Sequence, residues 1–138
     1  MKRYILDTNI LSDLIYRRYG VPERVMEARR NGGTIATTLP IIGEIYYGAN
    51  YSNDPEHYLR IIQPRTACIT KWPFTLEAAK KYGEIAATLK SEGKLIQQVD
   101  IQTAAIALTL GNCTIVTTDS DFVRIPGITI ENWRTTSS

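Results

Sequence analysis

The sequence predicts an α/β fold in which a largely parallel central sheet lies between two layers of helices. Short apolar runs typical of buried strands alternate with segments of helical spacing through most of the chain. No tight-turn signal clearly joins two of these runs, which favours parallel strands over hairpins. A chain of 138 residues also falls within the usual size of one domain. We therefore expect one three-layer α/β/α sandwich over residues 1–134, followed by a flexible tail at residues 135–138.

Residues 4–6 form the first predicted strand, a continuous apolar run of the kind that is buried on both faces of a sheet. Apolar residues at helical spacing follow directly and predict a helix over about residues 9–18, with Thr8 or Asn9 as its cap. Asp7 is therefore expected where a strand meets a helix N-terminus, which is where open α/β sheets bind their ligands.

The next stretch is expected to form three helices and one strand. A helix over about residues 22–31 begins with a proline, which suits a first turn, and residues 34–37 read as a second buried strand. Apolar residues spaced three and four apart predict a helix over about residues 40–48. The helix after it, over residues 55–63, is expected to stop before the proline that follows.

The second half of the chain repeats the alternation of strands and helices. Residues 67–70 predict a third strand, and Thr75 opens a long helix. A further helix begins at or near Asp100, and its small apolar residues indicate close packing on the sheet. A strand over residues 114–117, a turn and a last strand over residues 128–130 complete the expected fold.

The composition is that of an ordinary globular protein, with 43% apolar and 22% charged residues. Asp7 interrupts the N-terminal apolar run long before it could serve as a signal or membrane-spanning segment, so we expect a cytoplasmic protein with no membrane association. Cys68 and Cys113 lie in apolar, strand-like segments and are expected to be two buried thiols rather than a disulfide.

The net charge of +2 permits an anionic partner without requiring one. The distribution of the charge is more informative, because basic residues gather in the first quarter of the chain whereas the candidate site residues are acidic. Solvated helix faces are the ordinary explanation for such a group of charges. The basic residues are Arg17, Arg18, Arg24, Arg29 and Arg30.

Carboxylates recur at comparable places of the predicted fold. Asp7 follows the first strand, and Asp119 follows the fourth. Glu44 lies inside the helix after the second strand, and Asp100 stands at a helix start. The carboxyl ends of parallel strands meet where the strand order reverses, so Asp7 and Asp119 are expected to lie together, with Asp100 joining them. Asp121 is a candidate fifth acid.

Clustered carboxylates repel one another unless a cation or a proton compensates them. Oxygen ligands without histidine or cysteine suit Mg²⁺ or Mn²⁺ rather than zinc. Such a metal can activate water for in-line attack on a phosphodiester and stabilise the charge on the leaving oxygen. The predicted reaction class is therefore metal-dependent phosphodiester hydrolysis. The lone histidine, His57, is remote in sequence from these acids and is expected at the surface.

Each acid also has an ordinary structural interpretation. Asp100 and Asp119 suit helix caps, and Asp7 suits a turn at a strand end. Glu44 fits a solvated helix face less well, because its neighbours along the helix look buried. The residues that either support the site by orienting ligands or simply cap helices are Thr8, Asn9 and Thr118.

Taken together and in order, four segments of the chain resemble the motifs of the PIN-domain ribonucleases, specifically the VapC-type toxins of toxin-antitoxin pairs. Each segment contains one of the four acids, and the resemblance spans nearly the whole chain. The segments are residues 4–12, 42–49, 100–107 and 116–122. Residues 124–127 and 131–133 are similar to the ending of the family.

This resemblance implies a parallel sheet and a Mg²⁺ or Mn²⁺ ion held by Asp7, Asp100 and Asp119. It gives Glu44 an assisting role. It further implies endonucleolytic cleavage of RNA, a homodimer, and an inhibitory antitoxin whose tail occupies the acidic groove. The sequence departs from the family at residues 93–99, where members often carry proline and glycine.

Other function classes fit the same architecture. A non-catalytic RNA- or protein-binding module would be expected to lose one or more of the acids, and all four are present. A phosphatase with Asp7 as nucleophile usually has a second acid two residues on, where Asn9 stands. A phospho-acceptor domain would need an adjacent acidic pair that is missing here. DNA is distinguished from RNA as substrate only by contacts to the 2′-hydroxyl.

Overall fold

A sheet of five parallel strands forms the centre of residues 2–135, which are the residues that the computed structural model describes. The strands are β1 (Arg3–Leu6), β2 (Thr34–Thr38), β3 (Thr70–Trp72), β4 (Cys113–Val116) and β5 (Thr129–Glu131). Their spatial order is β3-β2-β1-β4-β5, and every neighbouring pair is parallel. The predicted parallel sheet is therefore confirmed.

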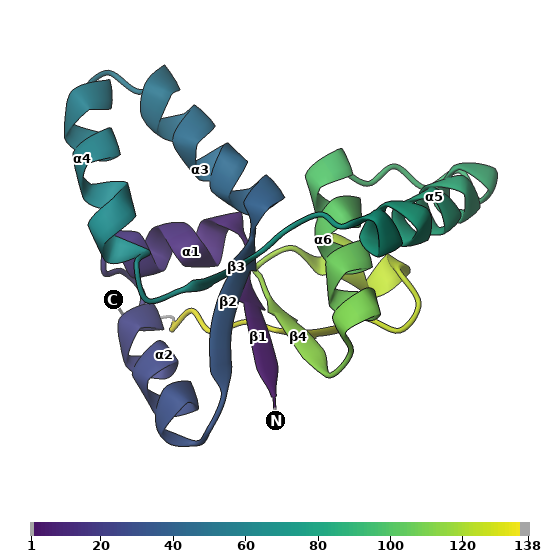
Figure 1. Ribbon diagram of the computed structural model, residues 1–138, viewed down its shortest axis with the longest axis horizontal. Helices are drawn as coiled ribbons and strands as arrows, with labels where there is room; N and C mark the ends of the chain where they lie inside the picture. The colour runs from purple at the N-terminus through teal and green to yellow at the C-terminus, as the bar shows by residue number, and fades with distance from the viewer. Residues whose placement is uncertain (1, 136–138) are drawn as a thin grey trace.

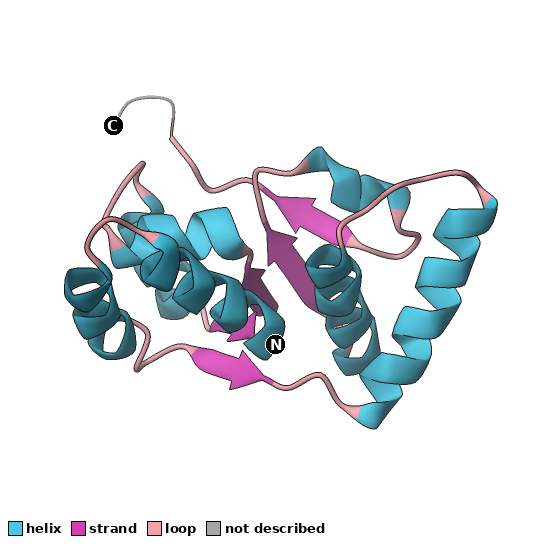
Figure 2. Ribbon diagram, turned by 90° about the horizontal axis from the view of Figure 1, so that it is seen from above, coloured by secondary structure: helices cyan, strands magenta, loops and turns pink. Residues whose placement is uncertain are grey.

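Helices cover both faces of this sheet (Figure 1 and Figure 2). They are α1 (Thr8–Ile15), α2 (Val21–Arg30), α3 (Leu39–Tyr51), α4 (Pro55–Arg65), α5 (Leu76–Ser91) and α6 (Gln98–Leu110), with a 3-10 helix η1 (Ser120–Arg124). Figure 1 shows α1 and α2 on one side of the sheet and α5 and α6 on the other, while α3 and α4 rise as a pair beyond the strand ends. The three-layer α/β/α architecture expected from the sequence is thus the observed one.

The central strand is β1, which pairs with β2 on one side and β4 on the other. Ile5 and Leu6 of this strand are fully buried, as are Ile115 and Val116 of β4 beside them. A strand covered by helices on both faces needs such a continuous apolar run. The chain leaves β1 towards β2, whereas β4 lies on the opposite side, so the order of the strands reverses between β1 and β4. This is the place where an open α/β sheet forms a crevice.

The third strand lies later than the sequence predicted. Residues 67–69 form a turn, and the strand begins only at Thr70. The Lys71 ammonium holds this turn by donating to the carbonyls of Thr66 (2.6 Å) and Ile69 (3.1 Å). Ile69 is buried all the same, which is why an apolar, β-branched run resembled a strand here. Cys68 is exposed on the turn and Cys113 is half-buried, so the expectation of two buried thiols is wrong, although both are free cysteines.

Two helix boundaries also differ from expectation. The helix α1 ends at Ile15 rather than near residue 18, because the backbone of Arg17 takes a left-handed conformation with φ 57°. The helix α4 continues past Pro64 to Arg65. A proline in a last turn removes one intrahelical hydrogen bond, and the end of α4 is closed by the Thr66 N–H donating to the Ile62 carbonyl (3.0 Å).

The C-terminal segment returns to the start of the fold. Thr135, the first residue of the expected tail, donates from its backbone N–H to the Tyr19 carbonyl (2.8 Å). Residues 136–138 of that tail lie outside the described part of the chain. Across the described ranges of the chain, we found no helix with the length and apolar character needed to span a membrane.

Candidate active site

Asp7 stands at the carboxyl end of β1 and occupies the N-cap position of α1. The sequence predicted Thr8 or Asn9 as the cap of α1, and this prediction is wrong. The Asp7 side chain makes no cap hydrogen bond. Its carboxylate instead accepts a hydrogen bond from the Thr117 hydroxyl (2.7 Å), and its backbone N–H donates to the Val116 carbonyl (2.9 Å). These contacts join the ends of β1 and β4.

Asp7 is only 6% exposed, and burial is the main reason that its pKa is raised. The hydrogen bond from Thr117 acts in the opposite direction, because it favours the ionised form. The charges of Glu44 and Asp119 raise the pKa further. Glu44 and Asp119 are therefore close enough to act on Asp7, although the three acids come from α3, the segment after β4 and the end of β1.

Asp119 follows β4 and has two roles in the local backbone. Its N–H donates to the Thr117 hydroxyl oxygen (2.9 Å), and one of its carboxylate oxygens accepts from the Asp121 N–H (2.8 Å) at the start of η1. Asp119 thus caps η1, which agrees with the structural interpretation of this acid as a helix cap. Its charge also raises the pKa of Asp7 and of Asp100. The Thr117 hydroxyl links Asp7 to Asp119 by bonding with both.

Asp100 lies in the first turn of α6, at the end of the helix that approaches the strand ends. Gln97 occupies the N-cap position of α6, so the helix-cap interpretation does not apply to Asp100. Burial, followed by the charges of neighbouring acids, raises the pKa of Asp100 to about 7. The acids that contribute, in decreasing order, are Asp7, Asp119, Glu44 and Asp121.

Glu44 reaches the same region from the middle of α3 and is half-buried. Its carboxylate accepts a hydrogen bond of 2.5 Å from the Thr8 hydroxyl, which holds α3 against the start of α1. The sequence interpretation that Glu44 does not belong to a fully solvated helix face agrees with this burial. Thr8 contacts an acid of the cluster rather than capping its helix.

The remaining supporting candidates lie at the edge of the cluster. The Asn9 side-chain amide donates to the Thr118 hydroxyl (3.2 Å), and both side chains remain accessible. Asp121 pairs with Arg124 (3.6 Å) and is about 40% exposed. His57 is exposed on α4, as predicted.

The carboxylate oxygens of these acids are the kind of ligand that a hard divalent cation such as Mg²⁺ prefers. The acids are oxygen ligands, two of them are nearly buried, and the neighbouring charges that raise their pKa values are carboxylates. Within residues 2–135, no three or more His, Cys, Asp or Glu side chains are gathered closely enough to enclose an ion as they stand. Glu44 and Asp119 each have one carboxylate oxygen engaged in a hydrogen bond, from the Thr8 hydroxyl and from the Asp121 N–H.

A groove with a volume of about 590 Å³ leads away from the acids along α1. It begins at Thr8, Asn9 and Glu44 and continues past residues that sequence reasoning did not single out as a group. Two of these, Tyr16 and Tyr58, meet edge to face with ring centroids 5.8 Å apart. Other polar side chains that line the groove are Ser12, Arg18, Ser52 and Asn53.

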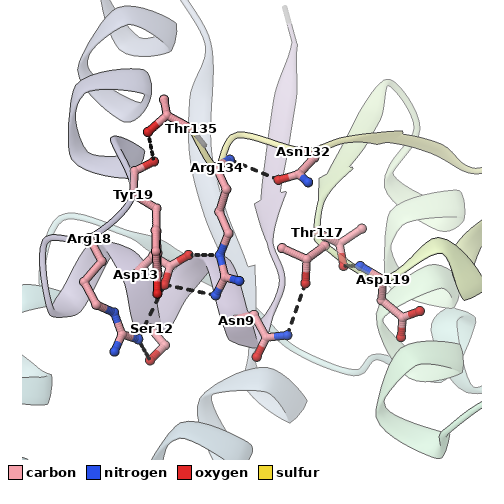
Figure 3. A network of polar contacts seen from close by, with 11 residues as sticks. Asn9, Ser12, Asp13, Arg18, Tyr19, Thr117, Asp119, Asn132, Arg134 and Thr135 are labelled. Atoms are coloured by element: carbon pink, nitrogen blue, oxygen red, sulfur yellow. Dashed lines mark hydrogen bonds and ion pairs between the residues drawn. The ribbon is translucent and has the colours of Figure 1, made fainter. Parts of the chain in front are cut away.

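Sequence reasoning also missed a second buried acid, Asp13, which is fully buried on α1. Figure 3 shows its carboxylate between two arginines. Arg134 from the C-terminal segment forms a bidentate pair with it (2.6 and 3.2 Å), and Arg18 lies 3.4 Å away. Its position in the sequence could have indicated that it is buried. Asp13 stands three residues after the buried Ile10 and therefore lies on the apolar side of the helix.

Comparison with known proteins identifies the family of this fold and these acids. Residues 4–128 match the model of the PIN domain. A Haemophilus influenzae protein called ribonuclease VapC2 is 32% identical over 134 residues, which cover 96% of this chain and 99% of that protein. A Shigella flexneri protein called tRNA(fMet)-specific endonuclease VapC is 28% identical over the same shares of the two chains.

A solved structure supports the same relationship. A chain in the crystal structure of VapBC2 from Rickettsia felis, bound to a DNA fragment from the promoter, superposes with a TM-score of 0.87. It is 27% identical to this chain, and the match covers 95% of this chain and 98% of the other. Helices and strands therefore correspond over almost the whole length of both chains.

Proposed function

This chain belongs to the PIN-domain family and, within it, to the VapC group, and we propose that it is a metal-dependent endoribonuclease acting as the toxin of a toxin-antitoxin pair. The observation that supports this most directly is the gathering of acids near the ends of β1 and β4: the charges of Glu44 and Asp119 raise the pKa of Asp7, and those of Asp7, Asp119 and Glu44 raise the pKa of Asp100. So many acids in one place are costly to the fold unless a cation offsets them.

In this proposal Asp7, Asp100 and Asp119 hold Mg²⁺ or Mn²⁺, and Glu44 assists. When bound, the cation supplies a polarised water nucleophile and stabilises the charge on the leaving oxygen of the phosphodiester. Thr117 keeps the Asp7 carboxylate pointed into the site, and Thr8 does the same for Glu44. Asn9, Thr118 and Asp121 stand at the rim, where they can orient the substrate.

The groove along α1 is the proposed path of the RNA strand. Of the four acids Glu44 lines it, and it extends to Arg18, so that an RNA strand with a phosphodiester at the acids would continue past Glu44 along polar and aromatic side chains. Tyr16 and Tyr58 offer ring surface to the bases, which stack on aromatic side chains irrespective of sequence.

Asp7→Asn is the experiment that tests this function. The amide keeps the size of the side chain but cannot bind a hard cation as a carboxylate does, so cleavage of RNA by the purified protein should fall by about a thousandfold or more. Growth inhibition on expression in bacteria should disappear, while the circular dichroism spectrum and the binding of the antitoxin stay unchanged. Undiminished cleavage by the pure variant would refute the proposal.

A parallel measurement separates an enzyme from a binding module. The unsubstituted protein is incubated with RNA in Mg²⁺, in Mn²⁺ and in a chelator, and the RNA ends are analysed. We expect cleavage in either metal and none in the chelator. RNA that is bound but not cut in either metal would favour the non-catalytic module.

The partners follow from the same family relationship. We propose a cognate antitoxin that binds at the acidic groove, a homodimer, and action in the cytoplasm, where RNA and antitoxin would both be available. The relative from Rickettsia felis is present in its crystal as a VapBC2 assembly. Co-expression with the protein encoded by an adjoining small reading frame, where the genome has one, followed by purification and sedimentation analysis, tests both the antitoxin and the homodimer.

A further inference from the structure

A second hollow lies at the far end of α1 from the acids, with a volume of about 190 Å³. Three arginines from different elements line it, together with apolar side chains such as Leu14 and Pro22. Arg17 follows α1, Arg29 belongs to the last turn of α2, and Arg65 is the last residue of α4. Among the described residues no carboxylate lines this hollow, so the charge of its lining is entirely positive.

The three guanidinium groups are not neutralised within residues 2–135. Arg18, Arg24, Arg60, Arg124 and Arg134 each have a carboxylate within ion-pair distance, whereas the three arginines of the hollow have none in the described chain. Each guanidinium has five N–H donors, and backbone contacts use few of them. Three arginines with unused donors therefore line one small volume.

Backbone contacts hold two of these arginines in place. Arg65 donates to the Ile15 carbonyl at the end of α1 (2.7 Å), and Arg29 donates to the Cys68 carbonyl (2.9 Å). Stabilising the end of α1 is an ordinary structural use of Arg65. It does not require the convergence of two further arginines. Two of the three arginines that line the hollow are thus anchored, and a guanidinium can bind a phosphate through two parallel hydrogen bonds.

We propose that Arg17, Arg29 and Arg65 bind a backbone phosphate of the RNA substrate at a distance from the cleavage site. This inference rests on the proposed function. It is favoured over an acidic protein segment by the position of the hollow, because the groove that contains Glu44 extends along α1 to Tyr16 and Arg18, the neighbours in sequence of Arg17 in the hollow. The eight residues of α1 span about 12 Å. An RNA that contacts both the acids and the arginine hollow must therefore be longer than an RNA that contacts the acids alone.

The consequence is selection for substrate length. An RNA chain that reaches the arginine hollow gains a charge-assisted contact, and its binding should release counterions there. A fragment that covers only the acids gains nothing from the three arginines. The hollow would thus distinguish long or structured RNA from short fragments without reading any base.

The test compares Arg17→Ala and the double variant R17A/R29A with Arg30→Ala. Arg17 makes no side-chain hydrogen bond or ion pair in the described residues, so its removal should leave the fold intact. Arg30 is the matched control, because it is an exposed arginine at the end of α2 that does not line the hollow. All variants also carry Asp7→Asn, which prevents cleavage during the titrations.

Binding is measured with long polyuridylate, and with a uridylate oligomer too short to reach the hollow, over a series of salt concentrations. We expect R17A/R29A to bind polyuridylate about tenfold more weakly than the Asp7→Asn parent. The slope of log affinity against log salt should fall by about 0.7 for each phosphate that the protein no longer neutralises. Arg30→Ala should change neither quantity, and the short oligomer should bind every variant equally.

Several outcomes would overturn the inference. Equal losses for the short oligomer, or for Arg30→Ala, would indicate a general effect of charge instead of a phosphate site. Unchanged polyuridylate binding with weaker binding of polyglutamate would assign the hollow to an acidic protein partner. These results differ from a failure of the proposed function, because cleavage by the unsubstituted protein and its loss in Asp7→Asn are measured without the arginine variants.

Discussion

Asp7 and Asp13 are both buried acids at the two ends of one short helix, yet their surroundings differ completely. Asp13 is fully buried and faces Arg134 and Arg18. Asp7 is 6% exposed and faces other carboxylates, with only the Thr117 hydroxyl as a side-chain donor. A buried charge that is paired holds the fold together, whereas a buried charge among like charges is retained at a cost to stability.

The same comparison separates structural acids from candidate catalytic acids in this chain. The Arg134 guanidinium comes from a position 121 residues away and ties the C-terminal segment to α1 (Figure 3). Asp13 in turn raises the pKa of Arg134, through the hydrogen bond first, because the pair favours the charged arginine. Within residues 2–135 no such pairing is present for Asp100, and the charges that shift its pKa are those of other acids.

The largest expected effect comes from exchanging each acid for its amide. Asp13→Asn leaves Arg134 without its carboxylate partner and should lower the free energy of unfolding by about 3 kcal/mol. Asp7→Asn removes one of several repelling charges and should leave the free energy of unfolding within about 1 kcal/mol of the parent, or raise it. Urea denaturation of both variants measures this, and equal losses of stability would remove the distinction between the two acids.

The pH dependence of stability gives an effect of comparable size with a defined sign. The pKa of Asp100 is about 7 in the folded protein, against its ordinary value of 3.8, so the folded state holds a proton that the unfolded state has lost between these values. Its contribution to stability is therefore fully present below pH 3.8 and lost as the pH rises through about 7. In a chelator, the free energy of unfolding should decline by roughly 2–4 kcal/mol from this group across that window.

Added metal provides the matching control for this pH effect. Mg²⁺ or Mn²⁺ would favour the ionised acids, so either ion should raise the melting temperature more at pH 7.5 than at pH 5. These two pH values lie above and below the pKa of Asp100 in the folded protein. Asp100→Asn should flatten the pH dependence in the chelator. A stability that instead rises with pH in the metal-free protein would contradict a protonated Asp100.

The smallest expected effect concerns the hydroxyl that joins Asp7 to Asp119. Thr117→Val keeps the shape of the side chain and removes the donor to the Asp7 carboxylate. Because this hydrogen bond lowers the Asp7 pKa, its loss should raise that pKa and shift the acidic limb of the pH-rate profile upwards. The free energy of unfolding should fall by about 1 kcal/mol. An unchanged pH-rate profile would mean that Thr117 does not control the ionisation of Asp7.

Much of the fold is visible in local patterns of residues. The apolar run before Asp7, the proline in the first turn of α2 and the glycine that ends α6 at a φ of 76° each act within a few residues of their position. The third strand was misplaced because Ile69 is buried in a turn rather than in the sheet, and burial alone does not distinguish the two. The end of α1 was misplaced because the positive φ of Arg17 has no local sequence signal.

The sequence by itself determined the alternation of strands and helices, the placing of Asp7, Asp100 and Asp119 at strand and helix ends, and that of Glu44 inside a helix. These features depend on backbone preference and on the period of apolar residues, which are local properties. Only the tertiary structure decided that Thr117 bonds to Asp7, that Asp13 pairs with Arg134, and that three arginines share one hollow. Such contacts join residues far apart in the chain, and they exist only after packing brings distant elements together.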